Sequence, residues 1–157
     1  MHLFSIRCAR SSDVDALMAI RHEAILALAS GTYGRDAAQE WAQGGTVARV
    51  QRALLEDQLF VAELNETLGW VEFAANEIKG LYVRPAQAQQ GIGSALLTYA
   101  EQAILAAGYE TITLDASWNA EEFYMRRGYQ PIAERSLKTG RPMRKRFAPS
   151  ANGTIER

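Results

Sequence analysis

The stretch that decides the fold is Leu81-Tyr82-Val83-Arg84-Pro85-Ala86-Gln87-Ala88-Gln89-Gln90-Gly91-Ile92-Gly93-Ser94-Ala95-Leu96-Leu97. A short apolar run ends at Pro85, crosses a polar loop and enters a long amphipathic segment through two glycines. The N-terminus of a helix exposes unpaired N–H groups and the positive end of its dipole. Glycines there let the backbone approach a ligand closely, so the stretch is typical of a phosphate-binding turn. The alternative is that the glycines only allow tight packing between strand and helix.

Two nucleotide-binding motifs do not fit this turn. The dinucleotide fingerprint needs a third glycine, and the position three residues after Gly93 is Leu96. The P-loop needs a lysine directly after its last glycine, and no lysine follows Gly91 or Gly93. The turn therefore indicates an anionic ligand outside those two folds.

The composition is that of one ordinary globular domain. The chain has 157 residues, of which 48% are apolar and 22% charged, and its net charge is −1. A nearly neutral chain gives no reason to expect nucleic acid as a partner. No basic-then-apolar leader opens the sequence, and no apolar run approaches the roughly 18 residues of a membrane span. We therefore expect a soluble, cytoplasmic protein without membrane association.

Cys8 is the only cysteine, which excludes an internal disulfide and a cysteine-rich metal site. It lies in an apolar-alternating segment at the start of the chain, so we expect a buried strand residue rather than a nucleophile. No metal is predicted.

The predicted elements make a mixed α/β (α+β) order without internal repeats. Strands are predicted at 3–9, 59–64, 68–74, 78–83, 111–115, 130–136 and 142–147, with hairpins joining 59–64 to 68–74 and 130–136 to 142–147. Helices are predicted at 14–28, 37–42, 46–54, 92–107 and 119–128, the first after capping-box spacing at 12–15 and the fourth ending at Gly108. We expect one domain over residues 1–148 and a flexible C-terminal tail over 149–157.

A second group of residues follows the predicted strand at 111–115. Asn119-Ala120-Glu121-Glu122 has the spacing of a capping box, and Phe123-Tyr124 and Gly128-Tyr129 follow it. In these residues, and in 77–97 before them, the chain resembles the GCN5-related N-acetyltransferase family. The resemblance spans most of 3–147. It implies a single domain with a mixed, mostly antiparallel sheet flanked by helices, whose central strands splay apart to admit the pantetheine arm of acetyl-CoA.

The resemblance also implies which residues hold acetyl-CoA. The loop and helix start would supply backbone N–H groups to the pyrophosphate, and the strand before them would pair with the pantetheine arm. Asn119 matches a residue that contacts this arm, although it can also serve only as the helix N-cap. The implied cofactor-binding set is Leu81, Tyr82, Val83, Ala88, Gln89, Gln90, Gly91, Ile92, Gly93, Ser94, Asn119 and Tyr124.

One position departs from the family pattern. The family usually has Arg or Gln where this chain has Ala88, which removes a possible phosphate contact and puts cofactor affinity in question. Arg84 and Arg126 are candidates to compensate for it. The basic residues at 141 and 144–146 are expected to form a solvated hairpin face.

Tyr124 matches the family's general acid, and its alternative role is an aromatic anchor of the helix. A lysine-like amine titrates near ~10.4 and must lose a proton before it attacks. Glu77 resembles a strand glutamate that serves as the base in several family members. Glu72 on the preceding strand is its rival, a water chain is a third possibility, and either glutamate can instead be a solvated strand-end charge.

The predicted function is transfer of acetyl from acetyl-CoA to a primary amine of a small molecule or peptide, by direct attack in a ternary complex. The alternative is a non-catalytic acyl-CoA-binding or sensor module of the same fold. A third reading, transfer of a longer acyl chain, depends on the room beside Trp118. We expect a monomer or homodimer, and the sequence does not identify the acceptor.

Overall fold

The computed structural model describes residues 3–27, 47–88, 90–136 and 139–148. The predicted helix at 37–42, Gln89 and the predicted tail at 149–157 lie outside the described residues. None of the helices in the described ranges is long and apolar enough to cross a membrane.

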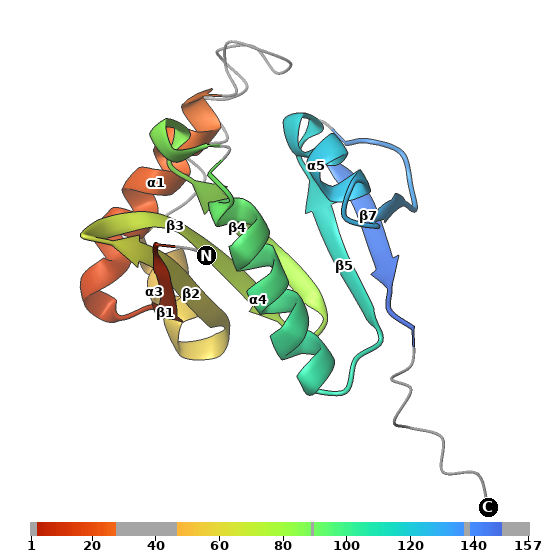
Figure 1. Cartoon of the computed structure of the whole chain (residues 1–157), viewed down its shortest axis with the longest axis horizontal. Helices are drawn as coiled ribbons and strands as arrows, with labels where there is room; N and C mark the ends of the chain where they lie inside the picture. Colours follow the sequence, from red (N-terminus) through yellow and green to blue (C-terminus); the bar gives the residue numbers. More distant parts are fainter. Residues whose placement is uncertain (1–2, 28–46, 89, 137–138, 149–157) are drawn as a thin grey trace, which may run out of the picture.

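The described residues form one open sheet with helices on both faces (Figure 1). Its strands, in spatial order, are β1 (Ser5–Cys8), β2 (Gln58–Leu64), β3 (Glu66–Ala74), β4 (Glu77–Val83), β5 (Thr111–Ala116), β7 (Arg141–Arg146) and β6 (Gln130–Pro131). Every neighbouring pair is antiparallel except β4 and β5, which are parallel. The predicted mixed, mostly antiparallel sheet is therefore confirmed.

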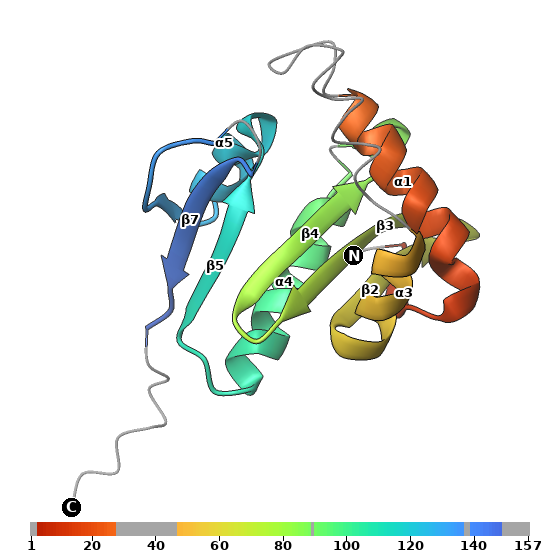
Figure 2. The ribbon, with the colours of Figure 1, turned by 180° about the vertical axis from the view of Figure 1, so that it is seen from behind.

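β4 and β5 separate after a short parallel ladder. They pair only at Glu77 with Thr113 and at Ile78 with Leu114. Beyond these positions the two strands diverge (Figures 1 and 2), and β4 continues to Val83 beside β3 alone. The predicted splayed central strands are confirmed.

Helices α1 (Val14–Ala27) and α3 (Val47–Glu56) cover one face of the sheet. Alternation along β2 and β3 turns Val61 and Trp70 toward these helices, because successive strand residues point to opposite faces. The Trp70 indole N–H donates to the Leu17 carbonyl at 3.0 Å, which satisfies the polar atom of the largest side chain in this core. The core thus fixes α1 over β3.

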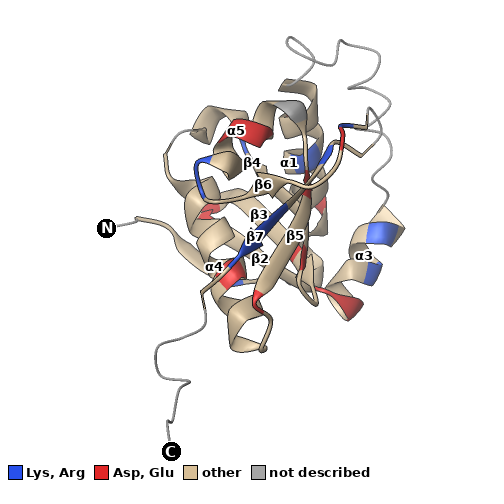
Figure 3. Ribbon diagram, turned by 90° about the vertical axis from the view of Figure 1, so that its right-hand side faces the viewer, with Lys and Arg blue, Asp and Glu red and all other residues tan. Residues whose placement is uncertain are grey.

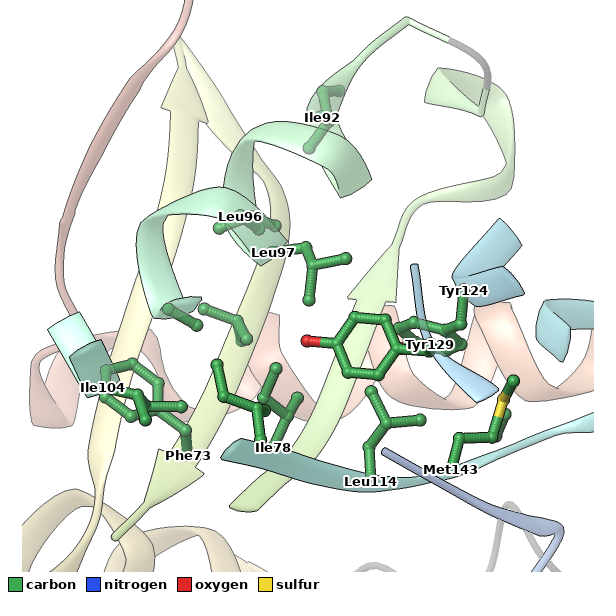
Figure 4. Close-up of a cluster of buried hydrophobic side chains, with 14 of the residues drawn as sticks. Phe73, Ile78, Ile92, Leu96, Leu97, Ile104, Leu114, Tyr124, Tyr129 and Met143 are labelled. Atoms are coloured by element: carbon green, nitrogen blue, oxygen red, sulfur yellow. The ribbon is translucent and has the colours of Figure 1, made fainter. Parts of the chain in front are cut away.

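Helix α4 (Ile92–Ala106) covers the opposite face. Its apolar stripe packs onto β2, β3 and β4, and Figure 4 shows Leu96 and Leu97 in this core. Gly108 follows with a φ of +101°, the left-handed conformation expected after a helix C-terminus. A 3₁₀ turn, Trp118–Ala120, and the short helix α5 (Glu121–Met125) follow β5 and place Tyr124 beside Tyr129 in the same core.

Three local expectations are wrong. Cys8 is exposed, because it ends the edge strand β1. Helix α5 has Ala120 at its N-cap, so Asn119 lies in the preceding 3₁₀ turn and does not cap that helix. The predicted strand at 130–136 is reduced to the two residues of β6 and one bridge between Ser136 and Gly140, since Pro131 has no N–H to extend the ladder.

The basic residues of β7, coloured blue in Figure 3, are only partly exposed. Lys145 Nζ lies 3.3 Å from Glu101 Oε2 and 4.6 Å from the centre of the Phe147 ring. Arg141 is half-buried, and its Nη1 lies 3.9 Å from Glu121 Oε1. The expected solvated face therefore holds for Arg144 and Arg146, and the other two residues brace the sheet against α4 and α5.

Candidate active site

The turn that enters α4 has the conformation a phosphate-binding loop needs. Gly91 has a φ of +82° at the N-cap of α4, in the left-handed region that side chains other than glycine rarely adopt. The first helical hydrogen bond runs from Ala95 N to Gly91 O at 3.0 Å. The N–H groups of the first helical turn therefore have no partner within α4, and they are available to a ligand.

A cavity of about 820 Å³ lies in front of this turn, between α4 and α5; we call it the cradle cavity. Gly91, Gly93 and Ser94 line one side of it, and Ala88 and Asn119 also border it. A Cβ added at Gly93 would lie 3.6 Å from both Val83 Cγ2 and Phe123 Cζ, in ordinary contact. The missing side chain at Gly93 therefore keeps this space open.

Arg127 lines this cavity and is absent from the cofactor-binding set predicted from the sequence. Its guanidinium stacks 3.7 Å from the centre of the Phe123 ring and donates to the Phe123 carbonyl at 2.8 Å. The same guanidinium donates to the Ser94 hydroxyl at the start of α4. Arg127 thus carries a positive charge to the cradle from the opposite wall. Its spacing of four from Phe123 is the sequence pattern that could have predicted contact between these two side chains.

The two arginines proposed to compensate for Ala88 lie in different places. Arg126 borders the cradle cavity, where its exposed side chain pairs with Glu122 at 2.5 Å. Arg84 does not line that cavity: it donates to the Thr67 carbonyl at 2.8 Å and pairs with Glu23 of α1 at 3.1 Å. Compensation by Arg84 is therefore not supported by its position.

A second cavity of about 360 Å³ continues from the cradle into the gap between the splayed strands; we call it the channel cavity. The two cavities share Val83, Ala88, Gly93, Asn119 and Phe123. Arg84 N donates to Leu68 O on β3 at 2.9 Å. Hydrogen-bonded pairs alternate along an antiparallel ladder, so the N–H groups of Leu81 and Val83 point away from β3 into the gap.

A third cavity of about 280 Å³ closes the path; we call it the inner cavity. It shares Leu81, Tyr82, Ser117, Ala120 and Tyr124 with the channel cavity. The three cavities therefore form one continuous route from the N-terminus of α4 to the ring of Tyr124.

Tyr124 is buried at the junction of the channel and inner cavities. Burial raises the pKa of its hydroxyl far above the ordinary value, Tyr82 adds to this shift, and Arg127 opposes it. Its ring also packs edge-on against Tyr129, with centroids 5.6 Å apart (Figure 4). Both predicted roles, proton donor and aromatic anchor, are compatible with this position.

The two candidate bases differ in position. Glu72 on β3 is buried, and Arg49 Nη2 lies 3.0 Å from its Oε2. A fourth cavity of about 270 Å³ borders Glu72 and shares Arg49 and Lys79 with the inner cavity. Desolvation by burial raises the pKa of Glu72, although Arg49 opposes this shift. A carboxylate with a raised pKa is the stronger base.

Glu77 is exposed at the first position of β4, where β4 and β5 are still paired. It lines none of the four cavities described above. The structure thus brings Leu81, Val83 and Tyr124 together along the three cavities of the route. Glu72 borders only the fourth cavity, and Glu77 borders none of the four. No group of three or more metal-binding side chains occurs among the described residues.

Comparisons with known proteins agree with this geometry. Residues 29–146 match the family model described as acetyltransferase (GNAT) domain. The chain is 29% identical over 139 residues to YafP of Escherichia coli K12, an uncharacterised N-acetyltransferase, covering 88% of this chain and 89% of YafP.

Two solved structures share the fold. The first is a GCN5-related N-acetyltransferase from Rhodopseudomonas palustris, with a TM-score of 0.88, 24% identity and coverage of 94% of this chain and 98% of that one. The second is the PaiA N-acetyltransferase from Thermoplasma acidophilum in complex with coenzyme A, with a TM-score of 0.80, 19% identity and coverage of 93% and 100%.

Proposed function

Because the chain belongs to the acetyltransferase (GNAT) family, we propose that it is an acetyl-CoA-dependent N-acetyltransferase that acts on a primary amine by direct transfer in a ternary complex. The observation that carries the proposal is the continuous route from the first turn of α4, through the gap between β4 and β5, to Tyr124. A long ligand with an anionic end and a reactive end fits such a route.

The residues along this route suit coenzyme A. The free N–H groups of the first turn of α4, together with Arg127 and Ser94, would hold the pyrophosphate. The N–H groups of Leu81 and Val83 would bind the pantetheine arm as an added strand binds a sheet edge. Gly93 leaves the cradle open where a side chain would fill it. Acetyl-CoA supplies a thioester, whose carbonyl carbon accepts the amine and whose sulfur leaves.

Backbone donors and Tyr124 have different roles at the thioester end of the route. An N–H group of β4 would stabilise the negative charge that grows on the carbonyl oxygen, an interaction worth typically ~10²–10³ in rate. Tyr124 holds its proton because burial raises its pKa, so its hydroxyl is a donor to the leaving sulfur across the working pH range. An ordinary thiol titrates near ~8.5, so Tyr124 is the weaker acid and acts on a sulfur that already carries charge.

Glu72 is the base that the geometry supports better. Its carboxylate lies behind Arg49 and Lys79, which border the inner cavity, so proton removal would run through water between these side chains. Glu77 stays a prediction with less support, because it is exposed outside the cavities. The acyl-chain question rests on the side chain of Trp118, which is outside the described part of the structure.

The rival function is a non-catalytic acyl-CoA-binding module. One observation favours it: Tyr124 packs against both Phe123 and Tyr129, as a purely structural residue would. In that case the route binds acyl-CoA and no acetyl transfer follows.

The Tyr124→Phe variant separates the two functions. For an enzyme, thiol release with a competent amine should fall at least tenfold, since proton transfer typically contributes ~10²–10⁴, while acetyl-CoA binding measured by calorimetry persists. Unchanged turnover would remove Tyr124 from the mechanism. No turnover by the wild-type protein with any amine, combined with acetyl-CoA binding, would favour the binding module. Absence of acetyl-CoA binding by the wild-type protein would contradict both functions.

A further inference from the structure

The wall of the inner cavity carries more positive than negative charge. Arg21 from α1, Arg49 from α3 and Lys79 from β4 line it, against one carboxylate, Asp115 from β5. Figure 3 shows basic segments on both α1 and α3. These helices lie on the side of the sheet opposite α4. Their positive charge therefore lies at the Tyr124 end of the route, where an acceptor would bind.

Arg21 is the most buried of these cations. It is 8% exposed, and its guanidinium carbon lies 5.9 Å from the centre of the Tyr82 ring. Tyr82 in turn borders both the inner cavity and the channel cavity. Arginine is the side chain best suited to bind a carboxylate in a partly buried site, because its planar fork of donors matches the two oxygens.

The acidic partners of Arg49 and Lys79 line the fourth cavity. Arg49 pairs with Glu72 at 3.0 Å, and Lys79 Nζ lies 3.1 Å from Asp57 Oδ2. Neither Glu72 nor Asp57 borders the inner cavity. The acceptor would therefore meet guanidinium and ammonium groups on this wall beside the one carboxylate of Asp115, while Glu72 and Asp57 lie outside the cavity.

The size of the inner cavity limits the acceptor further. Its volume of about 280 Å³ lies just below the ~300–1,000 Å³ usual for ligand pockets. A bulky polycyclic or oligosaccharide amine would exceed this volume and extend out of the cavity. A small molecule that carries both an amine and an anionic group suits both the size and the charge.

We propose that the acceptor is a small free amino acid, bound with its α-carboxylate against Arg21 and Arg49 and its α-amine beside Tyr82 and Tyr124. This inference rests on the proposed function. In the reaction a C–N bond forms between the amine and the acetyl carbon and the C–S bond breaks. The ammonium form of the amine first loses one proton to the base. The nitrogen loses a second proton after it attacks, and the sulfur gains one through Tyr124, so the products are the amide, the free thiol and one released proton.

Two other acceptor classes conflict with this wall. A peptide N-terminus carries an amide where a free amino acid carries its carboxylate, so it offers no charge to Arg21. A polyamine would bring a second cation toward Arg21 and Arg49, and like charges at close range repel. The proposal therefore separates amino acids from both classes by one functional group.

The test is thiol release from acetyl-CoA with matched acceptors that share a side chain: leucine, leucinamide, 3-methylbutylamine and the dipeptide leucylglycine, followed by other side chains in the same sets. We expect kcat/KM for the best free amino acid to exceed that of its amide and its decarboxylated amine at least tenfold. Equal rates for acid and amide, or a preference for spermidine, would overturn the proposal. A preference for 2-aminoethyl phosphate would assign the wall to phosphate and overturn the carboxylate.

Variants of Arg21 test whether this residue causes the preference for a carboxylate. Arg21→Gln should raise KM for the amino acid at least tenfold and leave KM for the amide unchanged, and Arg21→Lys should restore part of the preference. Arg144→Gln is the control, because Arg144 is an exposed residue of β7 that lines none of the four cavities. An Arg21→Gln protein with unchanged preference would contradict the proposal.

Calorimetry with acetyl-CoA distinguishes failure of this inference from failure of the proposed function. Retained acetyl-CoA binding by Arg21→Gln shows that the variant is folded. Acetyl-CoA binding without turnover of any amine by the wild-type protein would overturn the proposed function and this inference with it. Turnover of amines without preference for a carboxylate would overturn the inference alone.

Discussion

Arg49 and the buried carboxylate of Glu72 form an ion pair, 3.0 Å from Nη2 to Oε2, and Arg49 separates Glu72 from the inner cavity. Burial raises the pKa of Glu72, and Arg49 opposes that shift, so the ion pair partly offsets the cost of burying the charge. A buried charge of this kind, next to a cavity and with a perturbed pKa, is a recognised mark of a functional site.

Glu72→Gln and Glu77→Gln are expected to separate the two candidate bases. Glu72→Gln should lower kcat at least tenfold, since it removes the proton acceptor behind Arg49 and leaves the acetyl-CoA route intact. The Glu77→Gln change affects an exposed residue outside the cavities and should change kcat less than twofold. Steady-state thiol release at several pH values measures both. The reverse ranking would restore Glu77 as the base, and two unaffected variants would indicate water.

The pH profile of kcat tests the proton state of Tyr124. Burial raises its pKa above the ordinary tyrosine value of ~10, so the hydroxyl stays protonated as the pH passes through 10. We therefore expect no fall in kcat between about pH 9 and pH 10 at saturating amine. Tyr124→Phe should lower kcat across this range without changing the alkaline shape. A fall near pH 10 in the wild-type protein that is absent from Tyr124→Phe would show that Tyr124 titrates there.

Elements with strong local patterns were predictable from the sequence. The apolar stripe of 92–107 with its flanking glycines predicts α4 closely, and the runs on either side of Asn65 predict the β2–β3 hairpin. Asn65 itself takes a φ of +61° at that turn, as asparagine tolerates. The splayed strands came from resemblance to a family, because no local pattern states where two strands will part.

The missed features depend on contacts between distant residues. Arg127 reaches Ser94 from 33 positions away, and the ion pair of Arg49 and Glu72 joins α3 to β3. Cys8 sits in a segment with a buried-strand pattern, yet the position of β1 at the sheet edge leaves it exposed. Residue spacing along the chain does not show which distant side chains will meet, or which strand will lie at the edge of the sheet.

Gly91→Ala and Gly93→Ala are expected to have opposite effects on stability and similar effects on binding. Gly91 has a φ of +82°, and the left-handed conformation costs other residues about 1–2 kcal/mol, so Gly91→Ala should lower Tm. Gly93 is helical with only ordinary contacts around its missing Cβ, so Gly93→Ala should keep or raise Tm. Its methyl group would nevertheless occupy the cradle cavity and weaken acetyl-CoA binding. Thermal denaturation and calorimetry measure the two effects, and undiminished binding by Gly93→Ala would contradict the cradle.

Arg127→Gln is expected to weaken acetyl-CoA binding about tenfold or more, because a charge-assisted hydrogen bond contributes roughly 1.5–3 kcal/mol. Its guanidinium borders the cradle and contacts Ser94, where the pyrophosphate is proposed to bind. Arg84→Gln is the comparison, since Arg84 pairs with Glu23 and does not line that cavity. Calorimetry with acetyl-CoA should show a loss for Arg127→Gln only. Equal losses would show that the phosphate contact does not depend on Arg127.

Asp13→Asn is expected to lower stability at neutral pH and to lose this effect in acid. The Asp13 carboxylate accepts from Arg7 at 2.8 and 2.9 Å and from the Arg10 backbone N–H at 2.7 Å, and the bond to Arg7 is the main reason its pKa is lowered. A carboxyl whose pKa is lower in the folded state stabilises the fold above its unfolded pKa of ~3.9, and the contribution disappears as the pH falls through the folded value. The difference in Tm between the variant and the wild-type protein should therefore be full at pH 7 and shrink steadily below about pH 4.

Glu23→Gln, which removes a more exposed ion pair with Arg84, should change Tm little at any pH. A Tm difference for Asp13→Asn that stays constant from pH 7 to pH 2 would show that shape, and not charge, sets the contribution of Asp13.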